Sequence, residues 1–89
     1  MDIRDNPERS RYEMDVEGGV AFATYRADGK TVSIDHTEVP PHLRGRGIGD
    51  RLVRGVLDAV RASGRTVVPR CGFVATYIRR HPEYRDLLA

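Results

Sequence analysis

The sequence is poor in the residues that build disulfide frameworks, metal clusters and membrane spans. Its 89 residues include one cysteine, Cys71, and no tryptophan. A single cysteine excludes an internal disulfide and a cysteine metal cluster. His36, His42 and His81 lack the i, i+4 spacing of a helical zinc pair, so we expect no metal. No apolar run approaches the roughly 20 residues of a membrane span. The first residues are too polar for a secretory signal, so we expect a cytoplasmic protein that binds no membrane.

Lysine is also scarce, because Lys30 is the only one and the remaining basic residues are arginines. The formal net charge is only +2, since acidic residues are interspersed throughout. Arginine clusters can bind nucleic acid. Here the arginines are scattered and no aromatic stacking platform accompanies them, so we expect no nucleic-acid partner. Hydrophobic content of 39% and charged content of 31% are typical of a globular domain, and the length predicts a single domain over residues 1–89.

The stretch RYEMDVEGGVAFATYRADGKTVSIDHTEV predicts an antiparallel meander of three strands. Gly18-Gly19 and the segment 27–30 supply the two turns. In the third strand, Val32, Ile34, His36 and Glu38 alternate with polar residues, which predicts that these four side chains share one face. Pro40-Pro41 ends the strand because proline cannot donate to a sheet.

A helix, a strand and short helical segments follow the meander. Apolar residues recur at helical spacing and predict one amphipathic helix that ends at Ser63-Gly64; they are Ile48, Leu52, Val53, Val56, Leu57 and Val60. The short segment RTVVP reads as a buried strand, which a right-handed crossover places parallel to the third strand. GFVATYIRR predicts a second helix, in which Phe73, Val74, Tyr77 and Ile78 form the apolar positions. PEYRDLLA predicts a final short helix. The order predicts an α/β (α+β) fold.

The segment RGRGIGD joins the third strand to the long helix. Its glycines allow close approach to the backbone, and the first amides of a helix lack intrahelical acceptors. Together with the helix dipole and two arginines, this arrangement is suited to a phosphate. A plain turn would need fewer glycines. A dinucleotide GxGxxG fingerprint fails at Asp50, and a phosphate-binding Walker A loop lacks its lysine.

These residues resemble a known family. The pattern Val39-x-Pro41-x-x-Arg44-x-x-Gly47-x-Gly49, between a strand and a helix, resembles the acetyl-CoA-binding motif of the GNAT superfamily of N-acetyltransferases. HTEVPPHLRGRGIGDRLV and VPRCGFVATYIRRHPEY resemble small stand-alone members. The resemblance implies a minimal GNAT fold with its core over about residues 10–87. It also implies loss of the N-terminal strand and helices that form much of the acceptor site in larger members.

The resemblance further implies which residues bind acetyl-CoA or coenzyme A as a co-substrate. The amides of Arg46, Gly47, Gly49 and Asp50 would hold the pyrophosphate. Arg44 is the motif arginine, and Gly45 and Ile48 would shape the loop. The strand end at Glu38 and Val39 would bind the pantetheine arm through the main chain. Asp50 departs from expectation, because its carboxylate lies near the phosphates.

His36 and Cys71 are the active-site pair that the resemblance suggests. His36 would act as general base for direct attack by an amine, or Cys71 would be acetylated first and pass the group on. Direct attack is the favoured reading, and Glu38 is a rival base. Cys71 could instead be a small core residue, and His36 a structural polar residue.

Two positions depart from the pattern of the family. Many GNAT enzymes use a tyrosine in the helix after the last core strand as the general acid that protonates the leaving thiolate, and the matching position here is Arg79. Gly72 stands where an asparagine often opens the same helix. Tyr77 is expected to pack in the core. We therefore expect an acetyl-CoA-dependent N-acetyltransferase acting on an amine, either a protein or peptide lysine or a polyamine. The alternative is a non-catalytic module that binds coenzyme A. The protein is expected to be a monomer or a weak homodimer.

Overall fold

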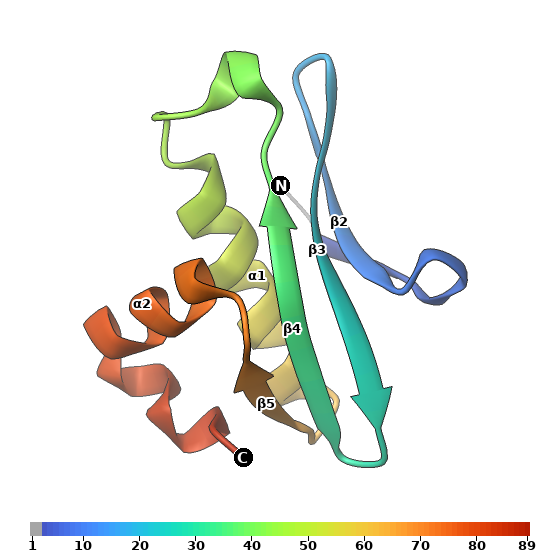
Figure 1. Ribbon diagram of the computed structural model, residues 1–89, viewed down its shortest axis with the longest axis vertical. Coiled ribbons are helices and arrows are strands. Elements are labelled where there is room, and N and C mark those ends of the chain that lie inside the picture. The colour runs from blue at the N-terminus through green and yellow to red at the C-terminus, as the bar shows by residue number, and fades with distance from the viewer. Residues whose placement is uncertain (1–2) are drawn as a thin grey trace.

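A computed structural model describes residues 3–89. Five strands form one sheet in sequence order, as Figure 1 shows. The first four pair antiparallel and the last pairs parallel with the fourth. The strands are β1 (Ile3–Asn6), β2 (Arg11–Val16), β3 (Gly19–Asp28), β4 (Thr31–Glu38) and β5 (Thr66–Pro69). The predicted meander and parallel strand are confirmed, with one antiparallel strand more than expected.

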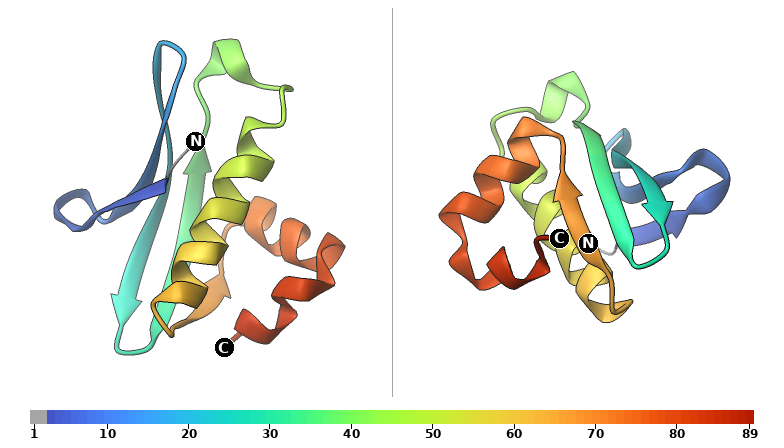
Figure 2. Two further views of the ribbon diagram at one scale, coloured as in Figure 1. Left: turned by 180° about the vertical axis from the view of Figure 1, so that it is seen from behind. Right: turned by 60° about the horizontal axis from the view of Figure 1, so that its bottom comes forward.

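Two α-helices and three 3-10 helices complete the chain. They are α1 (Ile48–Ala62), α2 (Gly72–Arg80), η1 (Pro7–Arg9), η2 (Pro41–Leu43) and η3 (Pro82–Leu87). Helix α1 crosses one face of the sheet, and α2 and η3 lie beside it near β5 (Figure 2). The final helical segment is therefore confirmed as a short helix of the 3-10 type. No helix among residues 3–89 is long and apolar enough to span a bilayer.

The hydrophobic core lies between α1 and the sheet. The predicted stripe of α1 is buried at Leu52, Val53, Val56, Leu57 and Val60. Strands β2 and β3 meet it with alternate residues, which are Tyr12, Met14, Ala21, Ala23 and Tyr25. Helix α2 adds Val74, Tyr77 and Ile78 to the same cluster. The position predicted for Phe73 in this stripe is wrong, because its side chain is 46% exposed.

Strand β1 was not predicted by the alternation, and it corrects the implied loss of an N-terminal strand. Its four residues pair with β2, from Ile3 opposite Met14 to Asn6 opposite Arg11. The Tyr25 hydroxyl donates to the Asp5 carboxylate at 2.5 Å. Ile3 lies so close to Gly55 of α1 that a β-carbon there would collide with it. Such a short polar strand is defined by its tertiary partners rather than by its own pattern. No α-helix precedes β2 in the described residues.

A β-bulge in β4 overturns the prediction that His36 and Glu38 share the face of Val32 and Ile34. Tyr25 of β3 pairs with Ile34, but its neighbour Thr24 pairs with His36, so Asp35 is an extra residue. An extra residue exchanges the two faces of all that follows, because side chains alternate with a period of two. Thr37, opposite the buried Ala23, therefore takes the inner face, and His36 and Glu38 take the outer one.

Candidate functional site

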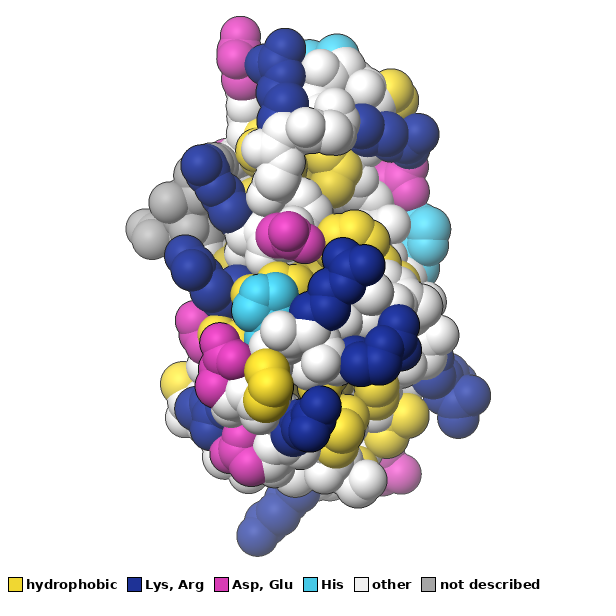
Figure 3. Space-filling view, turned by 90° about the vertical axis from the view of Figure 1, so that its left-hand side faces the viewer, with side chains coloured by type: hydrophobic (Ala, Val, Ile, Leu, Met, Phe, Trp, Pro, Cys, Tyr) yellow, Lys and Arg dark blue, Asp and Glu magenta, His cyan; other side chains and the backbone are white. Residues whose placement is uncertain are grey.

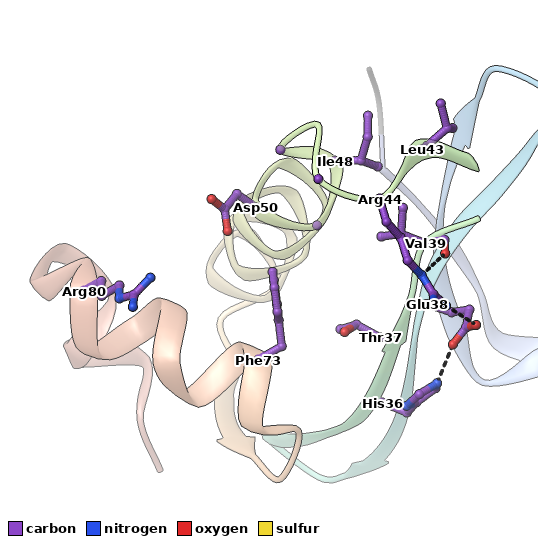
Figure 4. A pocket seen from close by; sticks show the side chains of 13 residues that line it. His36, Thr37, Glu38, Val39, Leu43, Arg44, Ile48, Asp50, Phe73 and Arg80 are labelled. Atoms are coloured by element: carbon purple, nitrogen blue, oxygen red, sulfur yellow. Dashed lines mark hydrogen bonds and ion pairs between the residues drawn. The ribbon is translucent and has the colours of Figure 1, made fainter. Parts of the chain in front are cut away.

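An open cavity of about 700 Å³ lies where the end of β4, the elbow at residues 44–50 and the start of α2 meet (Figure 4). Its size suits a small-molecule ligand rather than a water cluster. Most of the predicted site residues line it, namely His36, Glu38, Val39, Arg44, Gly45, Gly47, Ile48, Gly49 and Asp50. Arg46 and Cys71 do not belong to the lining. Thr37, Leu43, Phe73 and Arg80 line the cavity as well.

The elbow has the backbone of an anion cradle. Gly45 and Gly47 both adopt left-handed conformations, with φ of 80° and 75°. Gly47 caps α1, and the first amide to find a helical acceptor belongs to Arg51, which donates to Gly47 O at 3.2 Å. Among residues 3–89, the amides of Gly47, Ile48 and Gly49 have no protein acceptor. These amides and the helix dipole fit a phosphate group.

Asp50 is the acidic residue of the first turn of α1, and its exposed side chain borders the same cavity. An acid in this position suits the helix dipole. Figure 4 shows its carboxylate on the side of the first turn that faces α2, where Arg80 also lies. The cation of Arg80 therefore accompanies Asp50 on that side of the cavity.

Two side chains, His42 and Arg44, hold the elbow in place. The His42 ring bonds to the Glu17 carbonyl through Nε2 at 2.9 Å, which ties η2 to the β2–β3 turn. Arg44 folds back along the strand end, where its Nε donates to Val39 O at 3.3 Å and its guanidinium lies 3.5 Å from Glu38 Oε1. Arg44 thus contacts a main-chain group that was predicted to bind pantetheine, and it links the elbow to the acidic residue at the end of β4.

His36 and Glu38 form a hydrogen-bonded pair on the outer face. His36 Nε2 lies 2.8 Å from Glu38 Oε2. A carboxylate can only accept, so in the neutral ring Nε2 carries the proton and Nδ1 keeps a lone pair. The His36 side chain is 61% exposed. The two residues that were considered as alternative bases are therefore one unit, in which the carboxylate orients the imidazole.

Cys71 lies on the other side of β4 from this pair. It caps the N-terminus of α2, and its amide donates to Ile34 O at 2.9 Å. Its Sγ is 3.7 Å from Thr37 Oγ1, and Thr37 borders the cavity. No hydrogen bond between His36 and Cys71 is found within residues 3–89. The expected pair is thus separated by the strand, and Thr37 is the residue that joins the cysteine to the cavity.

The tyrosines near α2 make their contacts outside the cavity. Tyr77 is buried, which confirms its predicted place in the core, and its ring stacks on His81 with ring centroids 3.9 Å apart. Burial, with the Asp58 carboxylate that accepts the hydroxyl's hydrogen bond, raises the pKa of Tyr84 to about 12. No tyrosine belongs to the cavity lining in the described part of the chain.

Figure 3 shows the side of the molecule that carries α2 and the elbow, where arginines are spread among acidic side chains.

The fold and the cradle define an α/β protein with an anion-binding site at a β-strand–loop–helix junction. The sequence profile of the GCN5-related N-acetyl-transferase family matches residues 11–87. The chain therefore belongs to this family. No group of three or more potential metal ligands occurs in residues 3–89.

Curated relatives and a solved structure agree with this assignment. Protein NATD1 of Xenopus tropicalis is 36% identical over 53 residues, which cover 60% of this chain and 49% of the relative. Protein NATD1 of Homo sapiens is 35% identical over 63 residues, covering 70% and 56%. The chain spans about half the length of these relatives. The NMR structure of a GCN5-like protein from Staphylococcus aureus superposes with a TM-score of 0.72 at 25% identity, covering 99% of this chain and 87% of that one.

Proposed function

We propose that the protein transfers the acetyl group of acetyl-CoA to a primary amine. The observation that carries this proposal is one cavity that joins an anion cradle to an oriented imidazole. The free amides at the start of α1 lie at one end, and the His36–Glu38 pair lies at the end of β4. The family uses acetyl-CoA, and the residues here suit its phosphates and its thioester arm.

The proposed reaction is direct attack. The amine nitrogen forms a bond to the thioester carbonyl carbon, the carbon–sulfur bond breaks, and coenzyme A leaves as its thiolate. His36 accepts the proton of the attacking amine at Nδ1, the nitrogen left free by the contact with Glu38. Glu38 keeps the ring in this tautomer and stabilises the imidazolium that forms. The exposure of His36 suits an acceptor on an extended chain, such as a peptide lysine or a polyamine.

The route through an acetylated Cys71 is less well supported. Its thiol lies on the inner side of β4 and contacts Thr37 rather than His36. Acetyl transfer through sulfur would need the thiol to reach the cavity past Thr37. We expect Cys71→Ala to keep most of the turnover, whereas His36→Gln loses at least about a hundredfold. A Cys71→Ala protein without activity would favour the two-step route.

The first test is the thermal stabilisation of the protein by acetyl-CoA. A ligand at 100 times its Kd adds about 2.7 kcal/mol, which raises the Tm of a domain of this size by roughly 10–20 °C. Gly47→Glu is expected to abolish this rise. Gly29→Glu is the matched control, because Gly29 also has a positive φ and open surroundings but lies in the distant β3–β4 turn. No rise in the wild type at millimolar acetyl-CoA would contradict the proposal.

A specific observation favours a second candidate, a module that binds coenzyme A without turnover. No tyrosine hydroxyl borders the cavity in residues 3–89, and the resemblance to GNAT enzymes puts Arg79 at the position of their general-acid tyrosine. The two candidates separate in an acetyl-transfer assay with spermidine and with lysine peptides. Acetyl-CoA binding together with His36-dependent product supports the enzyme, and binding without product from either acceptor supports the module.

A further inference from the structure

Phe73 is the second residue of α2, and its ring stands in the cavity rather than in the core. It is 46% exposed, whereas the other apolar residues of α2 are buried. An aromatic ring that lies outside the core is costly to leave in water, because burial of its apolar surface is favourable. In Figure 4 the ring rises from α2 toward the first turn of α1, across the cavity from Thr37.

The first turn of α1 is shaped to receive this ring. A β-carbon placed on Gly49 would come within 2.8 Å of Phe73 Cζ and 3.2 Å of its Cε1. Gly49 has an ordinary helical conformation, in contrast to Gly45 and Gly47, whose φ angles are positive and whose surroundings are open. The glycines of the elbow therefore meet two different demands. Gly45 and Gly47 allow the backbone to turn, and Gly49 makes room for the Phe73 ring.

The ring faces an apolar strip on the opposite wall. Val39 at the end of β4 and Ile48 at the start of α1 line the same cavity. The lining thus combines the free amides of α1, apolar side chains at Val39, Ile48 and Phe73, and the polar His36–Glu38 pair. A chain that runs from the amides to His36 would pass beside these apolar side chains.

We propose that Phe73 is the apolar wall that positions the pantetheine arm of coenzyme A, separately from the anion cradle. The inference rests on the proposed function, because it takes the ligand to be coenzyme A. Phe73 packs against the arm and holds it against β4. Its ring edge borders Gly49 of the cradle, but a phenylalanine ring has no hydrogen-bond donor for a phosphate. It acts as a positioning residue and takes no part in proton transfer.

Calorimetric titration with two probes tests this assignment. One probe is coenzyme A, and the other is 3′-phosphoadenosine 5′-diphosphate, which has the nucleotide without the arm. Phe73→Ala is expected to weaken coenzyme A binding about five- to tenfold and to change nucleotide binding less than twofold. Leu88→Ala is the matched control, since Leu88 is 44% exposed and lies outside the cavity lining. It should change neither affinity.

The outcomes are distinct from those that test the proposed function. Equal losses for both probes would mean that Phe73 acts through the cradle, which overturns the inference. Unchanged coenzyme A binding by Phe73→Ala would also overturn it. Phe73→Leu keeps an apolar side chain and should recover part of the lost affinity, while melting curves of each variant verify its fold. Absence of coenzyme A binding by the wild type is a failure of the proposed function itself, and the inference falls with it.

Discussion

The two faces of the sheet use the same strands but different interactions. The face beneath α1 presents apolar side chains that interlock with the helix, including Met14, Ala21 and Ile34, each 0–1% exposed. On the opposite face no helix formed by residues 3–89 covers β2, β3 and β4 (Figure 1). That face is organised by cross-strand charges, of which Arg26 with Asp35 and Arg4 with Asp15 are examples. One face is stabilised by removal from water, and the other is adapted to remain in it.

Glu13 is a buried charged residue on the outer face of the sheet. Only 5% of this residue is exposed, because Arg11 and Arg4 cover it and Asn6 donates to it. The Arg11 guanidinium also lies 4.3 Å from the centre of the Phe22 ring. A charge can be withdrawn from water here because its hydrogen bonds are supplied by the neighbouring strands.

The bulge at Asp35 determines which face of the sheet each site residue of β4 occupies. Beyond it the faces exchange, so the polar pair His36–Glu38 stands on the open face and Thr37 on the covered one. The end of β4 therefore presents functional groups on both faces of the sheet, and both sets line the cavity. A regular strand would have turned the imidazole toward the core instead.

The largest expected effect concerns the covered face. Leu57 is completely buried between α1 and the sheet, so Leu57→Ala should lower the free energy of unfolding by about 2–5 kcal/mol. Arg26→Ala, on the open face, should leave it almost unchanged because exposed ion pairs contribute little. Urea denaturation of both variants measures the contrast. Similar losses of unfolding free energy in the two variants would show that both faces contribute equally to the stability of the fold.

A chemical probe tests the exchange of faces at the bulge. In a Cys71→Ala background, a thiol introduced by His36→Cys should react with an aromatic disulfide reagent about tenfold faster than one introduced by Thr37→Cys. The reason is that position 36 faces solvent and position 37 faces inward. A faster reaction at position 37 would indicate a regular strand without the bulge.

The smallest expected effect is the acid response of the open face. The hydrogen bond from Arg11 lowers the pKa of Glu13 below its ordinary value of 4.5. A lowered pKa stabilises the folded state above about pH 4.5, and this contribution is lost as the pH falls through the folded-state value. Glu13→Gln removes it, so the gap in Tm between wild type and variant should be widest near pH 7 and narrow toward pH 3. A gap that stays constant over this range would show that the charge of Glu13 is not the cause.

Much of the fold was predictable because its patterns are local. The stripe of α1 repeats at helical spacing over four turns, and Gly64, with a φ of 74°, ends it as expected. The elbow could be predicted equally well, because closely spaced glycines before such a helix have few structural uses. The arrangement of the cavity residues followed less well. Phe73 fits the apolar pattern of α2, but its ring lies against Gly49 instead of in the core.

By itself the sequence determined the strands and α-helices from β2 onward, the glycine elbow and the family, because propensity, periodicity and turn chemistry are encoded within a few neighbouring residues. Only the tertiary structure decided the pairing of β1, the bulge at Asp35 and the folding back of Arg44 onto Val39. Each of these depends on a partner distant in sequence or on the register between two strands. A shift of one residue in that register changes no local pattern, but it moves His36 from one face of the sheet to the other.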